Sequence, residues 1–233
     1  MAEKPADGAL FEAEERKTFL TGRPYREFAA PKELDRHGPA KIISMVNQKG
    51  GVGKTTSTIN LGAALVEQGR KVLLVDLDPQ GALSAGLGIA HEDDQITVYD
   101  LLFDNTASIH AAIQHSKVSG LDLVPANIDL SAAEIQLVNE VGREHTLARA
   151  LRPVRNEYDY IFIDCGPSLG LLTVNALAAS HGVIIPMEGE YYSLRGLALL
   201  TDTVEKVRDR INFDLDIVGI LVTMFDRRTT HAR

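Results

Sequence analysis

The feature that most constrains the fold is a series of short apolar runs that begins at Lys41 and recurs along the chain. Val, Ile and Leu dominate these runs, which read KIISMVN, KVLLVDLD, LDLVPA, YDYIFID, HGVIIPM and DLDIVGILVTMF. Runs of this length and composition are typical of strands buried on both faces of a sheet. Segments of helical length separate several of them, at 54–69, 143–155, 169–180 and 193–212. The alternation predicts an α/β fold, a doubly wound, mostly parallel sheet with helices on both faces.

Residues 1–39 have a different composition from the rest of the chain. They are polar and charged, and prolines interrupt them at positions 5, 24, 31 and 39. Such a segment buries too little apolar surface to offset the entropy lost on ordering. We therefore expect a disordered tail at 1–39, followed by a single globular domain at 40–233.

Composition and charge limit the cellular compartment and the kinds of ligand that we expect for this chain. The chain has 233 residues, one cysteine and a formal net charge of −8 at pH 7. A single cysteine and no recognisable secretory leader favour a reducing, cytoplasmic setting without disulfides. No apolar run has the length needed to span a bilayer. The negative charge argues against wrapping nucleic acid over the whole surface, although a local basic patch would not show in the sum.

The stretch QKGGVGKTT follows the first predicted strand and opens a helix, the order that a phosphate-binding loop requires. Its glycines allow successive N–H groups to turn around an anion, and the helix N-terminus adds partial positive charge. Lys54 is placed to reach the β- and γ-phosphates, and the Thr55 hydroxyl to coordinate Mg²⁺. The predicted nucleotide-binding residues are Gly50, Gly51, Val52, Gly53, Lys54, Thr55 and Thr56. The loop departs from the standard pattern, because Gln48 replaces the first glycine and Lys49 adds a second lysine.

Carboxylates end two of the predicted strands, at the edge where parallel sheets bind ligands. Asp164 closes YIFID, where an acid would hold magnesium through water. LLVDLDPQG offers Asp76 and Asp78. We assign Asp78 to orienting the attacking water, and expect Asp76 to support the loop or the metal geometry without contacting the metal.

These motifs together resemble the ParA/Soj family of chromosome- and plasmid-partition ATPases, in the deviant Walker-A class that also contains MinD. The resemblance rests on KGGVGKTT, LLVDLDPQG, YIFIDCGPSLGLLTVNAL, IIPMEGEYYSLRGL and VTMFDRRT, and it runs from about residue 41 to the last residue. Loops of this class read K-G-G-x-G-K-[ST], which accounts for Gln48. By this likeness Lys49 is the signature lysine, which reaches across a nucleotide-sandwich homodimer to the partner subunit's phosphates.

The resemblance implies an Mg²⁺-dependent ATPase, slow without its partner, that binds ATP or ADP. The ATP dimer would coat nonspecific DNA in a cytoplasmic, nucleoid-associated state, and a ParB-like protein would stimulate hydrolysis and release it. No stable membrane association is expected. Adenine contacts in this family fall near the strand-end motif, which makes Met224, Phe225 and Asp226 candidates. The catalytic residues that we expect are Lys49, Lys54 and Asp78, with Thr55 and Asp164 at the metal.

The chain ends at Arg233, where members of the family continue through further helix and strand. We therefore expect a C-terminally incomplete ATPase domain whose DNA binding needs residues beyond Arg233. Alternative functions remain open at this point. One is a nucleotide-binding scaffold or inactive fragment with little turnover, and another is a MinD-like positioning ATPase, which would need a basic amphipathic C-terminal helix.

Overall fold

The computed structural model of the protein describes residues 32, 34–89, 94–189 and 193–225. Most of the predicted tail, at 1–31 and 33, lies outside the described residues. Within the rest of that predicted tail, His37 Nδ1 lies 2.7 Å from the Asp159 carboxylate, and the Gly38 N–H donates to it at 3.0 Å. The predicted tail boundary after residue 39 stays a prediction.

The described strands form one sheet in the order β3-β4-β2-β5-β1-β6-β7. Neighbours pair in parallel except β3 with β4, so the predicted mostly parallel sheet is confirmed. Each predicted apolar run contains a strand, whereas the two-residue strand β3 carries too short a pattern to recognise. The strands are β1 Lys41–Met45, β2 Val72–Leu77, β3 Gln114–His115, β4 Leu121–Val124, β5 Tyr160–Cys165, β6 Gly182–Glu188 and β7 Asp216–Thr223.

The predicted helices are present within a few residues, and the segment at 143–155 is a short helix between two 3₁₀ turns. Four further helices escape prediction because they are only four to eight residues long, too short to display a clear 3.6-residue period. The helices are α1 Lys54–Glu67, α2 Ala82–Gly86, α3 Val98–Phe103, α4 Ile109–Ala112, α5 Leu130–Leu137, α6 Thr146–Leu151, α7 Leu171–Ala179 and α8 Ser193–Arg210. The 3₁₀ turns are Arg143–His145 and Arg152–Val154.

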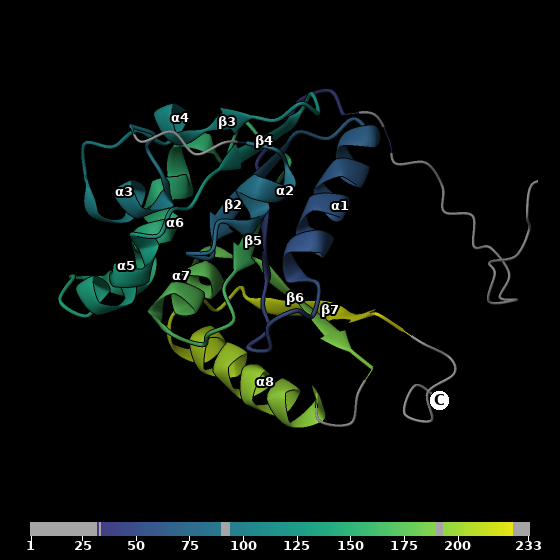
Figure 1. The fold of residues 1–233 in the computed structure, drawn as a ribbon, viewed down its shortest axis with the longest axis vertical. Helices are drawn as coiled ribbons and strands as arrows, with labels where there is room; N and C mark the ends of the chain where they lie inside the picture. The colour runs from purple at the N-terminus through teal and green to yellow at the C-terminus, as the bar shows by residue number, and fades with distance from the viewer. Residues whose placement is uncertain (1–31, 33, 90–93, 190–192, 226–233) are drawn as a thin grey trace, which may run out of the picture. The chain divides into compact units, whose positions relative to one another are not determined.

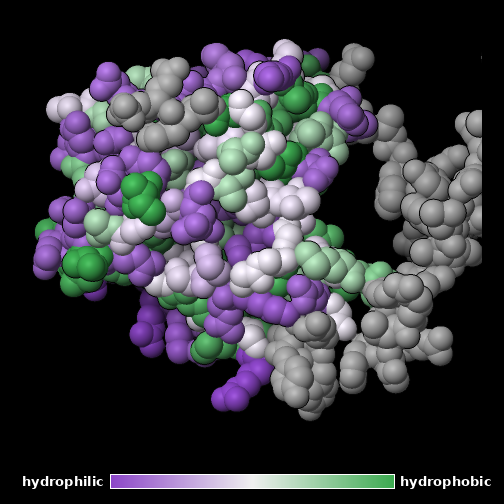
Figure 2. Space-filling view, in the orientation of Figure 1, coloured by the Kyte–Doolittle hydropathy of each residue, from purple (hydrophilic) through white to green (hydrophobic). Residues whose placement is uncertain are grey.

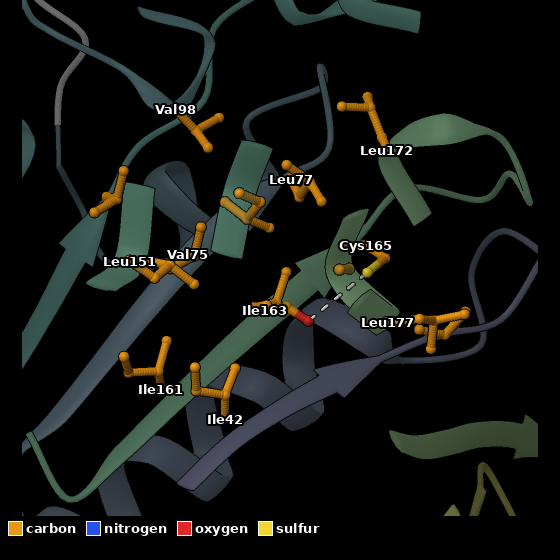
Figure 3. Packing of buried hydrophobic residues seen from close by; sticks show 14 of the residues in the cluster. Ile42, Val75, Leu77, Val98, Leu151, Ile161, Ile163, Cys165, Leu172 and Leu177 are labelled. Atoms are coloured by element: carbon orange, nitrogen blue, oxygen red, sulfur yellow. Dashed lines mark hydrogen bonds between the residues drawn. The ribbon is translucent and has the colours of Figure 1, made fainter. Parts of the chain in front are cut away.

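Successive strand residues enter two different cores, one on each face of the sheet. Ile42 and Leu73 belong to the core that α3 to α8 cover, whereas their neighbours Ile43 and Leu74 belong to the core under α1 and α2. Figure 1 shows these helices on the two sides of the sheet, and Figure 3 shows the larger core. Because side chains alternate along a strand, a continuous apolar run fills both cores.

The register of the central strands places their carboxyl ends level with one another. Asp164 of β5 pairs with Met45 of β1 on one side and with Asp76 of β2 on the other. The loops that follow β1, β2 and β5 therefore leave the sheet at the same edge. This edge carries the polar residues that the sequence singles out.

Candidate nucleotide-binding site

The loop between β1 and α1 has the open backbone that an anion site needs. Gly51 and Gly53 adopt positive φ angles of 77° and 86°, and Gly53 is the N-cap of α1. Gly50 and Gly51 are exposed, and a Cβ atom at either would meet nothing within 4 Å, so no protein atom crowds the loop at these two positions. Val52 is buried and anchors the loop, and its carbonyl accepts a 2.8 Å hydrogen bond from the Thr223 hydroxyl at the end of β7.

Lys54 points its ammonium into this loop. Its side chain is buried, and Nζ donates to the Lys49 carbonyl at 3.3 Å. Burial lowers the pKa of Lys54, while the nearby charges of Asp164 and Asp78 act in the opposite direction. A multiply charged phosphate group would stabilise a buried ammonium at the N-terminus of a helix.

Asp164 is the acid that the sequence places at the metal, and the structure leaves one of its oxygens unsatisfied. The residue is 1% exposed, and Oδ1 accepts a 3.4 Å hydrogen bond from the Thr58 hydroxyl. Burial raises the pKa of Asp164 to about 6, and hydrogen bonding from Thr55 and the Lys54 charge partly offset the rise. Oδ2 is buried without a hydrogen-bond partner among the described residues. An orphaned carboxylate oxygen beside a threonine hydroxyl fits the oxygen donors that a hydrated Mg²⁺ prefers.

Asp76 and Asp78 have different environments although only one residue separates them. Asp76 is fully buried and accepts backbone N–H bonds from Asp78, Leu83 and Ser84 at 3.1, 3.2 and 3.4 Å. Burial nevertheless raises the pKa of Asp76 to about 7. Its contacts hold the turn that follows β2, as expected for a residue that supports loop geometry. Asp78 is only partly buried, and its carboxylate lies opposite Gly166, where an added Cβ would approach Cγ to 3.5 Å.

Lys49 lies at the entrance to the loop, in contact with the end of β6. Its ammonium forms a 2.6 Å ion pair with Glu188, and its backbone N–H donates to the Asn47 side chain at 2.9 Å. Asn47 Nδ2 in turn donates to the Pro186 carbonyl at 2.7 Å. The second lysine of the loop is thus held by its own chain in this conformation.

The predicted adenine contacts lie at the carboxyl end of β7. Met224 has a positive φ of 50° and is 67% exposed, and Phe225 is 53% exposed. Figure 2 shows hydrophobic surface over this end of the strand. Both residues directly follow Thr223, which bonds the phosphate loop, so they lie at the loop's flank. Asp226 lies outside the described residues, and exposed Thr56 occupies the first turn of α1.

The structure adds residues that the sequence did not single out. Thr58 links α1 to Asp164, Thr223 closes the loop from β7, and Glu188 binds Lys49. Glu134 of α5 contacts the loop that follows β5, because Ser168 donates to its carboxylate at 3.4 Å. Glu188 and Thr223 lie within the motifs IIPMEGEYYSLRGL and VTMFDRRT, but neither motif assigned them a role. The one available signal was the position of Glu188 and Thr223 at the ends of predicted strands.

A cavity of about 500 Å³ opens beside the turn after Asp78. Its lining includes Pro79, Gly81, Ala85, Ala126 and Ile128, which come from the ends of β2 and β4 and from α2. The cavity therefore lies at the same sheet edge as the phosphate loop.

In the part of the chain that the structure describes, no helix is both long and apolar enough to cross a membrane.

Comparisons with known proteins identify a matching family and similar chains from bacteria. The family described as "AAA domain" matches residues 40–217. An uncharacterized protein of Mycobacterium tuberculosis (strain H37Rv) is 67% identical over 92% of this chain and 67% of its own length. The sporulation initiation inhibitor protein Soj of Bacillus subtilis (strain 168) is 54% identical over 81% of this chain and 74% of its own length.

A solved structure of similar fold contains the expected ligands. Cobyrinic acid a,c-diamide synthase of Mycobacterium smegmatis, crystallised with an ATP analog and magnesium, superimposes with a TM-score of 0.79 and 44% identity. The match covers 83% of this chain and 79% of that one. Its bound ligands are of the kind that the open loop, Lys54 and the unsatisfied Asp164 oxygen fit.

The raised pKa of Asp164 predicts that the stability of the nucleotide-free protein depends on pH. Between pH 4 and pH 6 the folded state holds a proton that the unfolded state has released, so stability falls as pH rises. Asp164→Asn should therefore raise the unfolding free energy of the nucleotide-free protein by about 1–3 kcal/mol at pH 8 and by little at pH 3. Urea unfolding at the two pH values measures this. Asp209→Asn, on an exposed side chain, is the control, and an equal gain at both pH values would contradict the assignment.

Proposed function

The chain belongs to the ParA/Soj family of chromosome-partitioning ATPases, and we propose that it is an ATP-dependent dimerising ATPase that acts in chromosome or plasmid segregation. In this proposal the ATP-bound dimer binds DNA without sequence preference. A ParB-like partner stimulates hydrolysis, and hydrolysis ends the DNA-bound state.

The observation that carries the proposal is the pairing of a buried cation with an unsatisfied buried acid at one sheet edge. Lys54 has a lowered pKa because it is desolvated, and a nucleotide's phosphates would supply the negative charge that it lacks. One Asp164 oxygen has no hydrogen-bond partner among the described residues, and hydrated Mg²⁺ would supply its positive counterpart. Neither group is well satisfied by the chain alone, so Mg²⁺ and ATP bound together would stabilise both.

The chain's own residues would then divide the work of hydrolysis. The backbone N–H groups of Gly50 to Gly53 and the Lys54 ammonium would bind the β- and γ-phosphates. Mg²⁺, held by Thr55 and through water by Asp164, would neutralise charge on those phosphates. Asp78 would orient the attacking water, and the turn that Asp76 holds through backbone hydrogen bonds would fix its position.

Lys49 would act on the other subunit of a dimer. Two nucleotides between two subunits place many phosphate oxygens in a poorly solvated interface, where a cation supplied in trans offsets their charge. The cation contributes only when both halves close, so ATP becomes the bridge between subunits. Cleavage and release of the γ-phosphate would weaken that bridge.

The remaining parts of the proposal come from the family. The protein would act in the cytoplasm, associated with the nucleoid through lysine and arginine contacts to DNA phosphates. Met224, Phe225 and Asp226 would lie near adenine. Two alternatives from the sequence remain as outcomes of experiment: a scaffold that binds nucleotide without turnover, and a positioning ATPase that acts at a membrane.

One observation favours a second candidate function. A cavity of about 500 Å³ opens beside the Asp78 turn, at the same sheet edge as the phosphate loop, and the M. smegmatis relative is named as a synthase. An ATP-dependent synthase would release phosphate only when its acceptor is present. Phosphate release measured with DNA and, separately, with cobyrinic acid together with ammonia as the nitrogen donor distinguishes the two functions.

Removal of the Lys54 ammonium tests the nucleotide site. Lys54→Ala should lower ATP affinity at least 100-fold, because the phosphates lose their buried counter-charge. Isothermal titration calorimetry with Mg²⁺ and ATP measures the change, and Lys117→Ala on an exposed turn should match the wild type. Unchanged ATP affinity in Lys54→Ala would remove the phosphate-loop interpretation.

Two further substitutions separate dimerisation from hydrolysis. Lys49→Ala should still bind ATP but remain monomeric, whereas Asp78→Ala should form a dimer that persists because water is no longer oriented. Sedimentation velocity with ATP and a phosphate-release assay measure the two properties. ATP-dependent dimers of Lys49→Ala, or normal hydrolysis by Asp78→Ala, would contradict the roles assigned.

DNA binding should depend on nucleotide and on salt. If phosphate contacts dominate, affinity for a random duplex should fall about 10- to 1000-fold between 50 and 200 mM salt and should require ATP. A net charge of −8 opposes binding, so we expect it to be weak for these 233 residues. Gel shifts with ATP and with ADP test this, and tight binding without nucleotide would exclude an ATP-controlled DNA interaction.

A further inference from the structure

The signature lysine is not simply extended toward solvent. Its ammonium lies 2.6 Å from Glu188 Oε2, and the side chains of Lys49 and Glu188 are 46% and 19% exposed. The proposed trans contact needs this ammonium at the partner subunit's phosphates. In the proposed dimer, Lys49 would have to weaken its contact with Glu188 to bind the partner subunit's phosphates.

Glu188 is fixed more firmly than Lys49. It is the last residue of β6, a strand paired with β1 on one side and β7 on the other, and it lies in register with Thr223. Lys49, by contrast, stands at the mouth of the loop, followed by Gly50 and Gly51, which have no side chains to restrain the backbone. In any rearrangement, Lys49 is the partner that moves.

A second contact aligns the loop entrance with the same strand. Asn47 receives the Lys49 N–H and donates to the Pro186 carbonyl, two residues before Glu188. The backbone of Lys49 is thereby held at the end of β6, and its ammonium reaches Glu188 at the same strand end. The ion pair with Glu188 directs the ammonium toward the end of β6.

We propose that Glu188 is a positioning residue that holds Lys49 in cis and opposes its use in trans, so that it sets how readily the ATP-bound dimer forms. This inference rests on the proposed ATP-dependent dimerisation. When ATP is bound, the phosphates of the nucleotide in the partner subunit carry more negative charge than one carboxylate. They therefore compete successfully with Glu188 for the Lys49 ammonium. In ADP the missing γ-phosphate removes part of that attraction, and Lys49 stays with Glu188.

The size of the effect follows from the exposure of the pair. Ion pairs with this degree of solvent contact change an equilibrium constant by about 1.5- to 5-fold. A symmetric dimer breaks two such pairs, so the dimerisation constant should change by about 2- to 25-fold. Glu188 is also a negative charge that the dimer would bring near phosphates, and its neutralisation acts in the same direction.

Glu188→Gln tests the inference because it keeps the size of the side chain and removes the charge. The dimer dissociation constant in saturating Mg²⁺ and ATP should fall about 2- to 25-fold relative to the wild type. The protein should stay monomeric in ADP, with an unchanged thermal midpoint. Asp202→Asn is the matched control, since it removes another 2.6 Å carboxylate–lysine pair, with Lys206 on α8. Sedimentation equilibrium over a range of protein concentrations measures all three chains.

The outcomes separate the two proposals. A tighter ATP dimer for Glu188→Gln alone supports the cis contact as an opponent of dimerisation. An unchanged or weaker ATP dimer, while the wild type dimerises with ATP, overturns this inference and leaves the proposed function intact. If neither protein dimerises with ATP, the proposed function fails first and the inference with it.

Discussion

The structure depends on one unfavourable arrangement, the burial of Asp164 and Lys54 where β5 and α1 meet. Desolvation raises the pKa of the acid and lowers that of the lysine, so their mutual attraction does not offset the loss of water. The fold tolerates this cost because β5 lies at the centre of the sheet, between β1 and β2. Core packing on both faces supplies the stability, and the central strand end supplies a polar site shielded from bulk water.

Asp76 shows that burial alone does not make an acid functional. Asp76 and Asp164 are paired neighbours in the sheet, and both have pKa values raised by burial. Backbone N–H groups of the following turn satisfy the Asp76 carboxylate, whereas one Asp164 oxygen has no partner among the described residues. The Asp76 carboxylate therefore stabilises the turn after β2, whereas the Asp164 carboxylate can still accept a contact from a bound ligand. Hydrogen-bond satisfaction distinguishes the two acids better than their pKa values do.

The sequence predicted the parallel sheet, the phosphate loop and the strand-end acids because each depends on local pattern. Apolar runs identify buried strands, and glycines before Lys54 identify a loop with positive φ angles. The short helices α2 to α5 and strand β3 escaped, since periodicity needs more residues than they have. Contacts such as Lys49 with Glu188 and Thr223 with Val52 join residues 139 and 171 positions apart. Only the strand order of the folded sheet brings them together.

That strand order gives the phosphate loop two different flanks. On the β2 and β5 side are Asp164 and Asp78, which the proposed function assigns to the metal and to the attacking water. On the β6 and β7 side, Glu188 and Thr223 are paired residues of neighbouring strands, and each contacts the loop. A hydroxyl bonded to the Val52 carbonyl keeps the loop in shape, whereas a carboxylate paired with an exposed ammonium can be exchanged for another anion. The first contact is compatible with every state of the site. The second would have to weaken if Lys49 acts in trans. In the proposed ATP-dependent dimer, the β6 end, rather than the loop itself, would be the place where nucleotide state is converted into association.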